Sequence, residues 1–109
     1  MTKSIKVENM TSPNGNKVPN QFIIRNEIWN GMYKEYFQSY DSVIACIVYG
    51  YNQHREEEGT IYLDEKYWNY STTTKKYLNL FLNMSNEVVN KMVKHNRFKF
   101  TNLNDNKVH

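Results

Sequence analysis

The residues best suited to binding chemistry lie in the segment 64–81, where aromatic, hydroxyl and lysine side chains follow one another closely. The hydroxyls of residues 71–74 can cap the start of a helix, and a helix start exposes backbone N–H groups that attract anions. Two lysines add positive charge, and the Tyr and Trp rings could stack on a base or on a partner's side chain. An alternative stays open, in which Trp68 belongs to the core and the threonines only cap. The candidate residues are Tyr67, Trp68, Tyr70, Ser71, Thr73, Thr74, Lys75 and Lys76.

A second candidate surface lies near the end of the sequence. Residues 97–101 alternate cationic and aromatic side chains, which predicts a strand with Phe98 and Phe100 buried and the cations outward. Phosphate binding would explain this sorting, but so would an ordinary solvent-facing strand. The candidate residues here are Arg97 and Lys99, with Lys94 extending the surface.

Catalytic and metal-binding patterns are absent from the sequence. Its three histidines, at positions 54, 95 and 109, have no spacing typical of a zinc site, and Cys46 lies inside an apolar run. Asp64 and Glu65 follow a predicted strand and could hold a metal or act as an acid–base pair. The more ordinary interpretation is a loop whose aspartate binds its own backbone. We therefore expect a protein that is not an enzyme and uses no cofactor or metal.

Length and composition favour one domain over residues 1–109. The apolar share is only 39%, but the aromatic share of 15% makes a packed core feasible. A single cysteine excludes an intramolecular disulfide, and without a signal-like or membrane-spanning stretch a cytoplasmic location is expected. Residues 1–71 carry seven basic against nine acidic residues, whereas residues 72–109 carry seven against two. This split predicts one basic face.

The pattern of apolar residues predicts an α+β fold, an antiparallel sheet of about five to six strands with two helices on one face. A turn is expected at 11–16, an exposed loop at 52–59 and a frayed tail at 103–109. Residues 43–48 are β-branched and favour a strand, although Asp41 and Ser42 could instead cap a helix there. The predicted strands are 4–8, 20–25, 33–40, 43–48, 60–63 and 97–101, and the predicted helices lie near 72–83 and 86–95.

Several strings of this sequence resemble a family of small proteins carried by phages, plasmids and other bacterial mobile elements. They are NMTSPNGNKVPNQFII (9–24), YFQSY (36–40), VIA (43–45), LDEKYWNYS (63–71), TT (73–74), KYLN (76–79) and FL (81–82). The resemblance covers residues 4–82 well and the C-terminal third loosely. The family has no established enzymatic activity and no assigned catalytic residues, so the resemblance implies none for this chain. It also implies a context, because small phage-borne proteins without catalytic motifs are often inhibitors of host defence, including anti-CRISPR proteins.

Two hypotheses for function follow. In the first, a non-enzymatic anti-defence protein binds a bacterial immune effector such as a CRISPR nuclease; because the chain is basic, mimicry of DNA charge is disfavoured. In the second, the protein binds nucleic acid or a nucleotide signal, with Lys75, Lys76, Arg97 and Lys99 holding phosphates while Tyr67 or Trp68 stacks. Under either hypothesis, an edge strand near residues 5–8 could pair with its own copy, giving a homo-oligomer.

Overall fold

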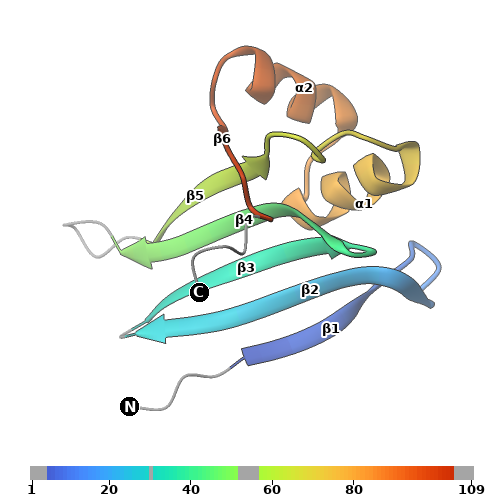
Figure 1. Ribbon diagram of the computed structural model, residues 1–109, viewed down its shortest axis with the longest axis horizontal. Helices are drawn as coiled ribbons and strands as arrows, with labels where there is room; N and C mark the ends of the chain where they lie inside the picture. Colours follow the sequence, from blue (N-terminus) through green and yellow to red (C-terminus); the bar gives the residue numbers. More distant parts are fainter. Residues whose placement is uncertain (1–4, 30, 52–56, 105–109) are drawn as a thin grey trace.

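A computed structural model describes residues 5–29, 31–51 and 57–104. One six-stranded sheet carries two helices on one of its faces (Figure 1). The spatial order of the strands follows the chain, and the first five pair antiparallel with their neighbours. This confirms the predicted α+β fold. The elements are β1 (Ile5–Thr11), β2 (Lys17–Trp29), β3 (Met32–Ser39), β4 (Ser42–Tyr51), β5 (Glu57–Asp64), α1 (Thr72–Leu82), α2 (Asn86–Lys94) and β6 (Lys99–Thr101).

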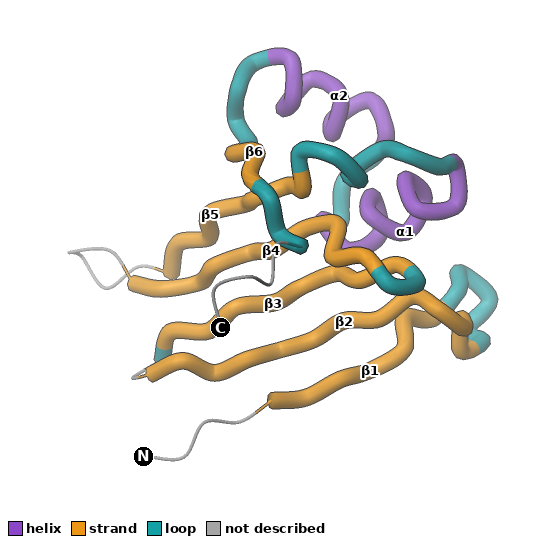
Figure 2. The backbone as a smooth tube through the Cα atoms, viewed as in Figure 1, coloured by secondary structure: helices purple, strands orange, loops and turns teal. Residues whose placement is uncertain are grey.

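The last strand departs from the antiparallel arrangement, because β6 pairs parallel with β5. Parallel neighbours need a long crossover between them, and here α1 and α2 form that crossover (Figure 2). The β6 strand is also shorter than predicted, since Arg97 and Phe98 precede it. Phe98 is buried as expected, but Phe100 is 40% exposed, which corrects the expectation that both rings are buried.

The segment 43–48 is a strand, as its β-branched residues predicted. It belongs to β4, which lies between β3 and β5 and forms backbone hydrogen bonds with both neighbouring strands. Ile44, Ala45, Cys46 and Ile47 are buried in succession, as fits a strand in the centre of the sheet. Asp41 belongs to the turn before β4 and Ser42 begins the strand, so neither residue caps a helix.

Two other boundaries differ from those predicted. The β2 strand is longer, and Pro19 lies inside it, where the ladder with β1 shifts register between Asn9 and Thr11. A proline is tolerated there because a bulge leaves N–H groups without ladder partners. The predicted loop at 52–59 is also shorter, since residues 57–59 already belong to β5, while residues 52–56 lie outside the described part of the chain.

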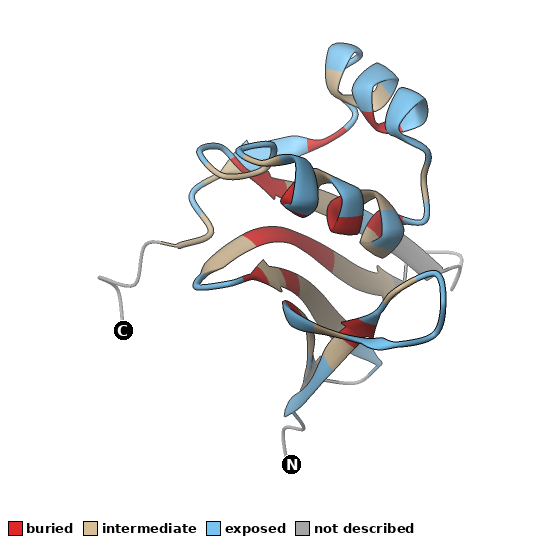
Figure 3. Ribbon diagram, turned by 90° about the vertical axis from the view of Figure 1, so that its right-hand side faces the viewer, coloured by how far each residue is buried: buried red, intermediate tan, exposed pale blue. Residues whose placement is uncertain are grey.

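The core lies between the sheet and the helices (Figure 3). Phe37, Ala45 and Leu63 are cross-strand neighbours on the face that the helices cover, and Leu78 and Val89 pack onto that face. On the two helices Tyr77, Leu78, Leu82 and Val89 are buried against the sheet, whereas Val88 is exposed. Among the described residues, no helix is long and apolar enough to cross a membrane.

Serine caps start both helices, and the cap of α1 lies in the hydroxyl run 71–74 that the sequence predicted. The hydroxyl of Ser71 accepts a hydrogen bond from the N–H of Thr74, and that of Ser85 accepts one from the N–H of Val88. An asparagine with positive φ follows each helix: Asn83 directly after α1, and Asn96 after His95 at the end of α2. Asparagine tolerates this left-handed conformation better than most residues, so these side chains help to set the turns between the helices and into β6.

Candidate partner-binding site

The loop between β5 and α1 is shaped by the buried carboxylate of Asp64. One of its oxygens, Oδ2, accepts hydrogen bonds from the N–H groups of Lys66 (3.1 Å) and Tyr67 (2.9 Å). The other, Oδ1, accepts from the N–H of Leu103 (2.8 Å) and the amide of Asn104 (3.0 Å). Both oxygens therefore hold the backbone in place, which matches the ordinary interpretation of this aspartate. Within the described ranges no group of three or more His, Cys, Asp or Glu side chains could hold a metal ion.

The same region of the structure contradicts the predicted fraying of residues 103 and 104. The side chain of Asn104 accepts a hydrogen bond from the backbone N–H of Val43 (2.7 Å) and donates one to the backbone carbonyl of Val43 (2.9 Å). Together with the bonds to Asp64, this fixes Leu103 and Asn104 against the ends of β4 and β5. The tail predicted to fray from residue 103 is thus held as far as Asn104, and residues 105–109 lie outside the described part of the chain.

The hydroxyl run at the start of α1 divides between the core and the surface. Thr74 is buried, and its hydroxyl lies 2.9 Å from that of Ser39 at the end of β3. Ser71 uses its hydroxyl to cap the helix, whereas Thr73 is exposed. Of the three hydroxyl residues proposed for binding, Thr74 is therefore not accessible to a partner, and it instead anchors α1 on the sheet.

The aromatic residues before α1 are also partitioned. Trp68 is half-buried, with its ring edge-on to Phe100 at 5.8 Å and the ammonium of Lys75 5.3 Å from its centre. The Tyr67 ring is half-buried and meets Tyr70 edge-on at 5.6 Å. Tyr70 is 49% exposed. The structure thus leaves Tyr70 as the ring best placed to contact a partner.

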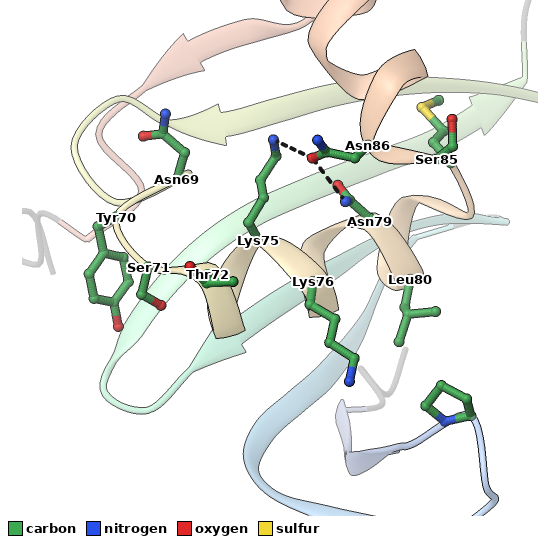
Figure 4. Close-up of a pocket in the computed structure, with 12 residues that line it drawn as sticks. Asn69, Tyr70, Ser71, Thr72, Lys75, Lys76, Asn79, Leu80, Ser85 and Asn86 are labelled. Carbon is green, nitrogen blue, oxygen red and sulfur yellow. Dashed lines mark hydrogen bonds between the residues drawn. The ribbon is translucent and has the colours of Figure 1, made fainter.

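Lys75 links the two helices. Its ammonium donates hydrogen bonds to the Oδ1 atoms of Asn86 and Asn90 of α2, each at 3.0 Å, and the amide of Asn79 also reaches Asn86 (Figure 4). No carboxylate of the described residues lies within ion-pair distance of this ammonium. Desolvation by burial lowers the pKa of Lys75 below its ordinary value. The result is a positioned cation whose neighbours are neutral amides.

An open groove of about 760 Å³ runs beside this cluster, along α1 and the α1–α2 connection. Lys76 points into solvent on the other side of α1 from Asn86 (Figure 4), and Leu80 is 45% exposed on the same helix. The lining holds two lysines, several amides and hydroxyls, and no carboxylate. It comprises Pro13, Asn69, Tyr70, Ser71, Thr72, Lys75, Lys76, Asn79, Leu80, Met84, Ser85 and Asn86.

The groove unites four of the predicted residues and adds others that the sequence did not single out. Tyr70, Ser71, Lys75 and Lys76 line it, whereas Tyr67, Trp68, Thr73 and Thr74 do not. Pro13 reaches the groove from the turn between β1 and β2, which nothing local in the sequence could reveal. Asn86 is the first residue of the second predicted helix. That position indicated a helix start but gave no sign that its side chain lines the groove.

The remaining predicted cations do not form one face with the groove. Arg97 lines a separate depression of about 430 Å³ with Val88, Lys91, Met92 and His95, and Lys94 is exposed near the end of α2. Lys99 is in register with Tyr62, and its ammonium lies 5.8 Å from that ring. Since Tyr62 alternates with the core residue Leu63, Lys99 lies on the sheet face that the helices leave open. The predicted basic face is therefore three separate surfaces.

These features define a small α+β domain, with a curled six-stranded sheet and a cationic groove beside its first helix. The chain belongs to a family of unknown function, DUF8033, which matches residues 5–99. No curated protein and no solved structure matches it.

Proposed function

We propose that this protein is a non-enzymatic binding protein whose groove along α1 holds an acidic segment of a partner protein. One observation carries the proposal: the lining offers two ammonium groups and several amide and hydroxyl groups, but no carboxylate. Such a lining attracts negative charge and repels cations. The exposed parts of Tyr70 and Leu80 add apolar contacts of the kind that anchor protein interfaces.

The two lysines have different parts in this proposal. Lys75 is already positioned by Asn86 and Asn90, so little side-chain freedom is lost when a carboxylate approaches it. Its partial desolvation, which lowers its pKa, is relieved by a negative partner. Lys76 is exposed and free to move toward an acidic side chain, which makes it suited to attracting the partner.

The identity of the partner is proposed from the resemblance to proteins of mobile elements. On that basis the partner is a bacterial immune effector, such as a CRISPR nuclease, and the protein acts in the host cytoplasm as an anti-defence inhibitor. The basic character of the groove supports contact with an acidic surface of the effector, and it argues against mimicry of DNA charge.

A nucleic acid or a nucleotide signal is the second candidate ligand. The exposed ring of Tyr70 beside Lys75 and Lys76 favours it, since such a ring can stack on a base while ammonium groups contact phosphate. The environment of Trp68 weighs against it, because Lys75 and Phe100 occupy the surroundings of that ring.

A charge-reversal comparison in a phage-challenged host tests the proposal. Cells with an active CRISPR nuclease should plate phage more efficiently when they express the protein, and the nuclease should co-purify with it. Lys76→Glu, in the groove, should reduce both effects at least about tenfold. Lys66→Glu makes the same charge change at an exposed residue outside the lining and should leave them intact.

Two results would contradict the proposal. Equal loss in both variants would show that total charge matters and the groove does not. No protection in any immune background would remove the anti-defence role. Fluorescence anisotropy separates the second candidate, because a phosphate ligand should bind labelled RNA, DNA or a cyclic nucleotide with an affinity that falls steeply as salt rises.

A further inference from the structure

The outer edge of β1 is an unpaired sheet edge within the described residues. The sheet order begins with β1, and β2 occupies only one of its sides. Ile5 and Val7 are 66% and 60% exposed on this strand. An edge that presents open backbone groups together with exposed β-branched side chains is a template for another strand.

The charges on β1 form no ion pair with the described residues. Lys6 lies directly opposite Arg25 of β2, a like-charge pair that weakens a sheet, and Glu8 lies opposite Ile23. Neither Lys6 nor Glu8 forms an ion pair with any described residue. Glu8 is in register with Ile23, and Lys6 is two residues away from Glu8 on the same strand. All three side chains therefore lie on one face of the sheet. The strand thus carries one positive and one negative charge, two residues apart on one face.

We propose that β1 pairs antiparallel with β1 of a second copy, about a two-fold axis at Val7. In this register Val7 lies opposite the partner's Val7, and Ile5 lies opposite the partner's Asn9. Lys6 lies opposite the partner's Glu8, and the symmetry repeats that ion pair on the other side of the axis. The two sheets become one continuous sheet.

The charges select this register over its neighbours. A two-fold axis perpendicular to the sheet places the helices of both copies on the same side of the joined sheet. Two residues that lie opposite each other must then point to the same face, so their sequence numbers differ by an even number. Moving the axis to Lys6 sets two lysines against each other, and moving it to Glu8 sets two glutamates against each other. Only the axis at Val7 places opposite charges together at both contacts.

Packing supports the same register. Val7, Ile24, Tyr36, Cys46 and Tyr62 are cross-strand neighbours, so they form a row across the face that the helices leave open. A second copy covers the exposed end of this row with its own Val7. The partner's Glu8 also offsets the repulsion between Lys6 and Arg25. A lysine on an edge strand usually prevents pairing, but here the glutamate two residues away turns that lysine into a complementary contact.

Charge exchange tests the pairing with two single variants. Sedimentation equilibrium should show the unmodified protein as a dimer at high concentration. Lys6→Glu and Glu8→Lys each set like charges at both contacts and should weaken the dimer at least about tenfold. A mixture of the two variants restores both ion pairs, so it should form a mixed dimer. The double variant Lys6→Glu/Glu8→Lys should dimerise like the unmodified protein.

The fold of the variants is checked by circular dichroism. Lys6→Glu places a carboxylate opposite Arg25, so the monomer should be at least as stable as before. A protein that stays monomeric at millimolar concentration would overturn the proposal, as would single variants that dimerise unchanged. Failure of the mixture and of the double variant to recover the dimer would overturn the register at Val7.

Discussion

The hydroxyls of Ser39 and Thr74 lie 2.9 Å apart in the buried core, although 35 residues separate them in the sequence. This contact fixes the first turn of α1 to the end of β3. Lys75 and Lys76 follow Thr74 directly, so the same contact determines how both lysines project along the groove. A bond inside the core therefore sets the position of charges on the surface.

The buried hydroxyl pair should show strong energetic coupling. Thr74→Val keeps the branched shape but removes the hydroxyl, leaving that of Ser39 without its partner. We expect a loss of about 1–3 kcal/mol in the free energy of unfolding, measured with urea. The double variant with Ser39→Ala should lose less than the sum of the single variants. Losses that simply add would show that the two hydroxyls do not interact.

The carboxylate of Asp64 should be essential for stability. It meets four hydrogen-bond donors, and Asp64→Asn replaces one acceptor oxygen with an NH₂ group that faces donors. We expect a loss of about 3 kcal/mol in the free energy of unfolding. The exposed neighbour provides a matched control, since Glu65→Gln removes the same charge and should change stability by less than about 0.5 kcal/mol. Similar losses in both variants would mean that net charge, and not this bond network, is responsible.

Features that depend on nearby residues were predictable from the sequence. The start of α1 was predictable because the hydroxyl run at 71–74 includes Ser71, which caps an N–H group only three residues away. The β4 strand was found because a run of β-branched residues restricts its own backbone. The α+β architecture followed from these local signals, since such elements have few ways of covering one apolar sheet face.

Features that depend on distant contacts were not predictable. The pattern around Asp64 indicated a loop, but its bond to Asn104, 40 residues later, depends on how the chain returns beside β5. Lys75 looked like a free cation beside a helix start, whereas α2 brings Asn86 and Asn90 to it. The parallel pairing of β6 has the same origin, because the two helices carry the chain across the sheet. Each of these contacts is decided by packing, which periodicity does not encode.

The protonation of Lys75 should affect stability at alkaline pH. Burial lowers the pKa of Lys75 in the folded state, so the folded chain releases this proton at a lower pH than the unfolded chain. Between the two pKa values the unfolded state holds more protons, and stability therefore rises with pH in that window. Lys75→Met lacks this contribution. The free energy of unfolding of the unmodified protein, relative to this variant, should increase as the pH rises toward the ordinary lysine pKa of about 10.4.

A second methionine variant controls for general charge effects in that experiment. Lys76→Met removes the same charge from an exposed neighbouring position. Subtracting its pH profile leaves the contribution of the Lys75 environment to the free energy of unfolding, which should rise with pH as the cost of burying the charge is removed. A difference that falls as the pH rises would contradict the desolvation of Lys75.

The thiol of Cys46 should resist modification in the folded protein. It is buried on β4 between Tyr36 and Tyr62 of the neighbouring strands, and desolvation raises its pKa, although Lys34 and a hydrogen bond from Tyr36 act in the opposite direction. Because the thiolate is the reactive form, both burial and the raised pKa slow its reaction with a disulfide reagent. We expect the folded protein to react at least about 100-fold more slowly than the urea-unfolded chain at pH 8. Cys46 is the single cysteine of the sequence, so the released chromophore reports on this position alone. Rates within about twofold of each other would show that the sheet opens readily at β4, which the packing of this central strand does not allow.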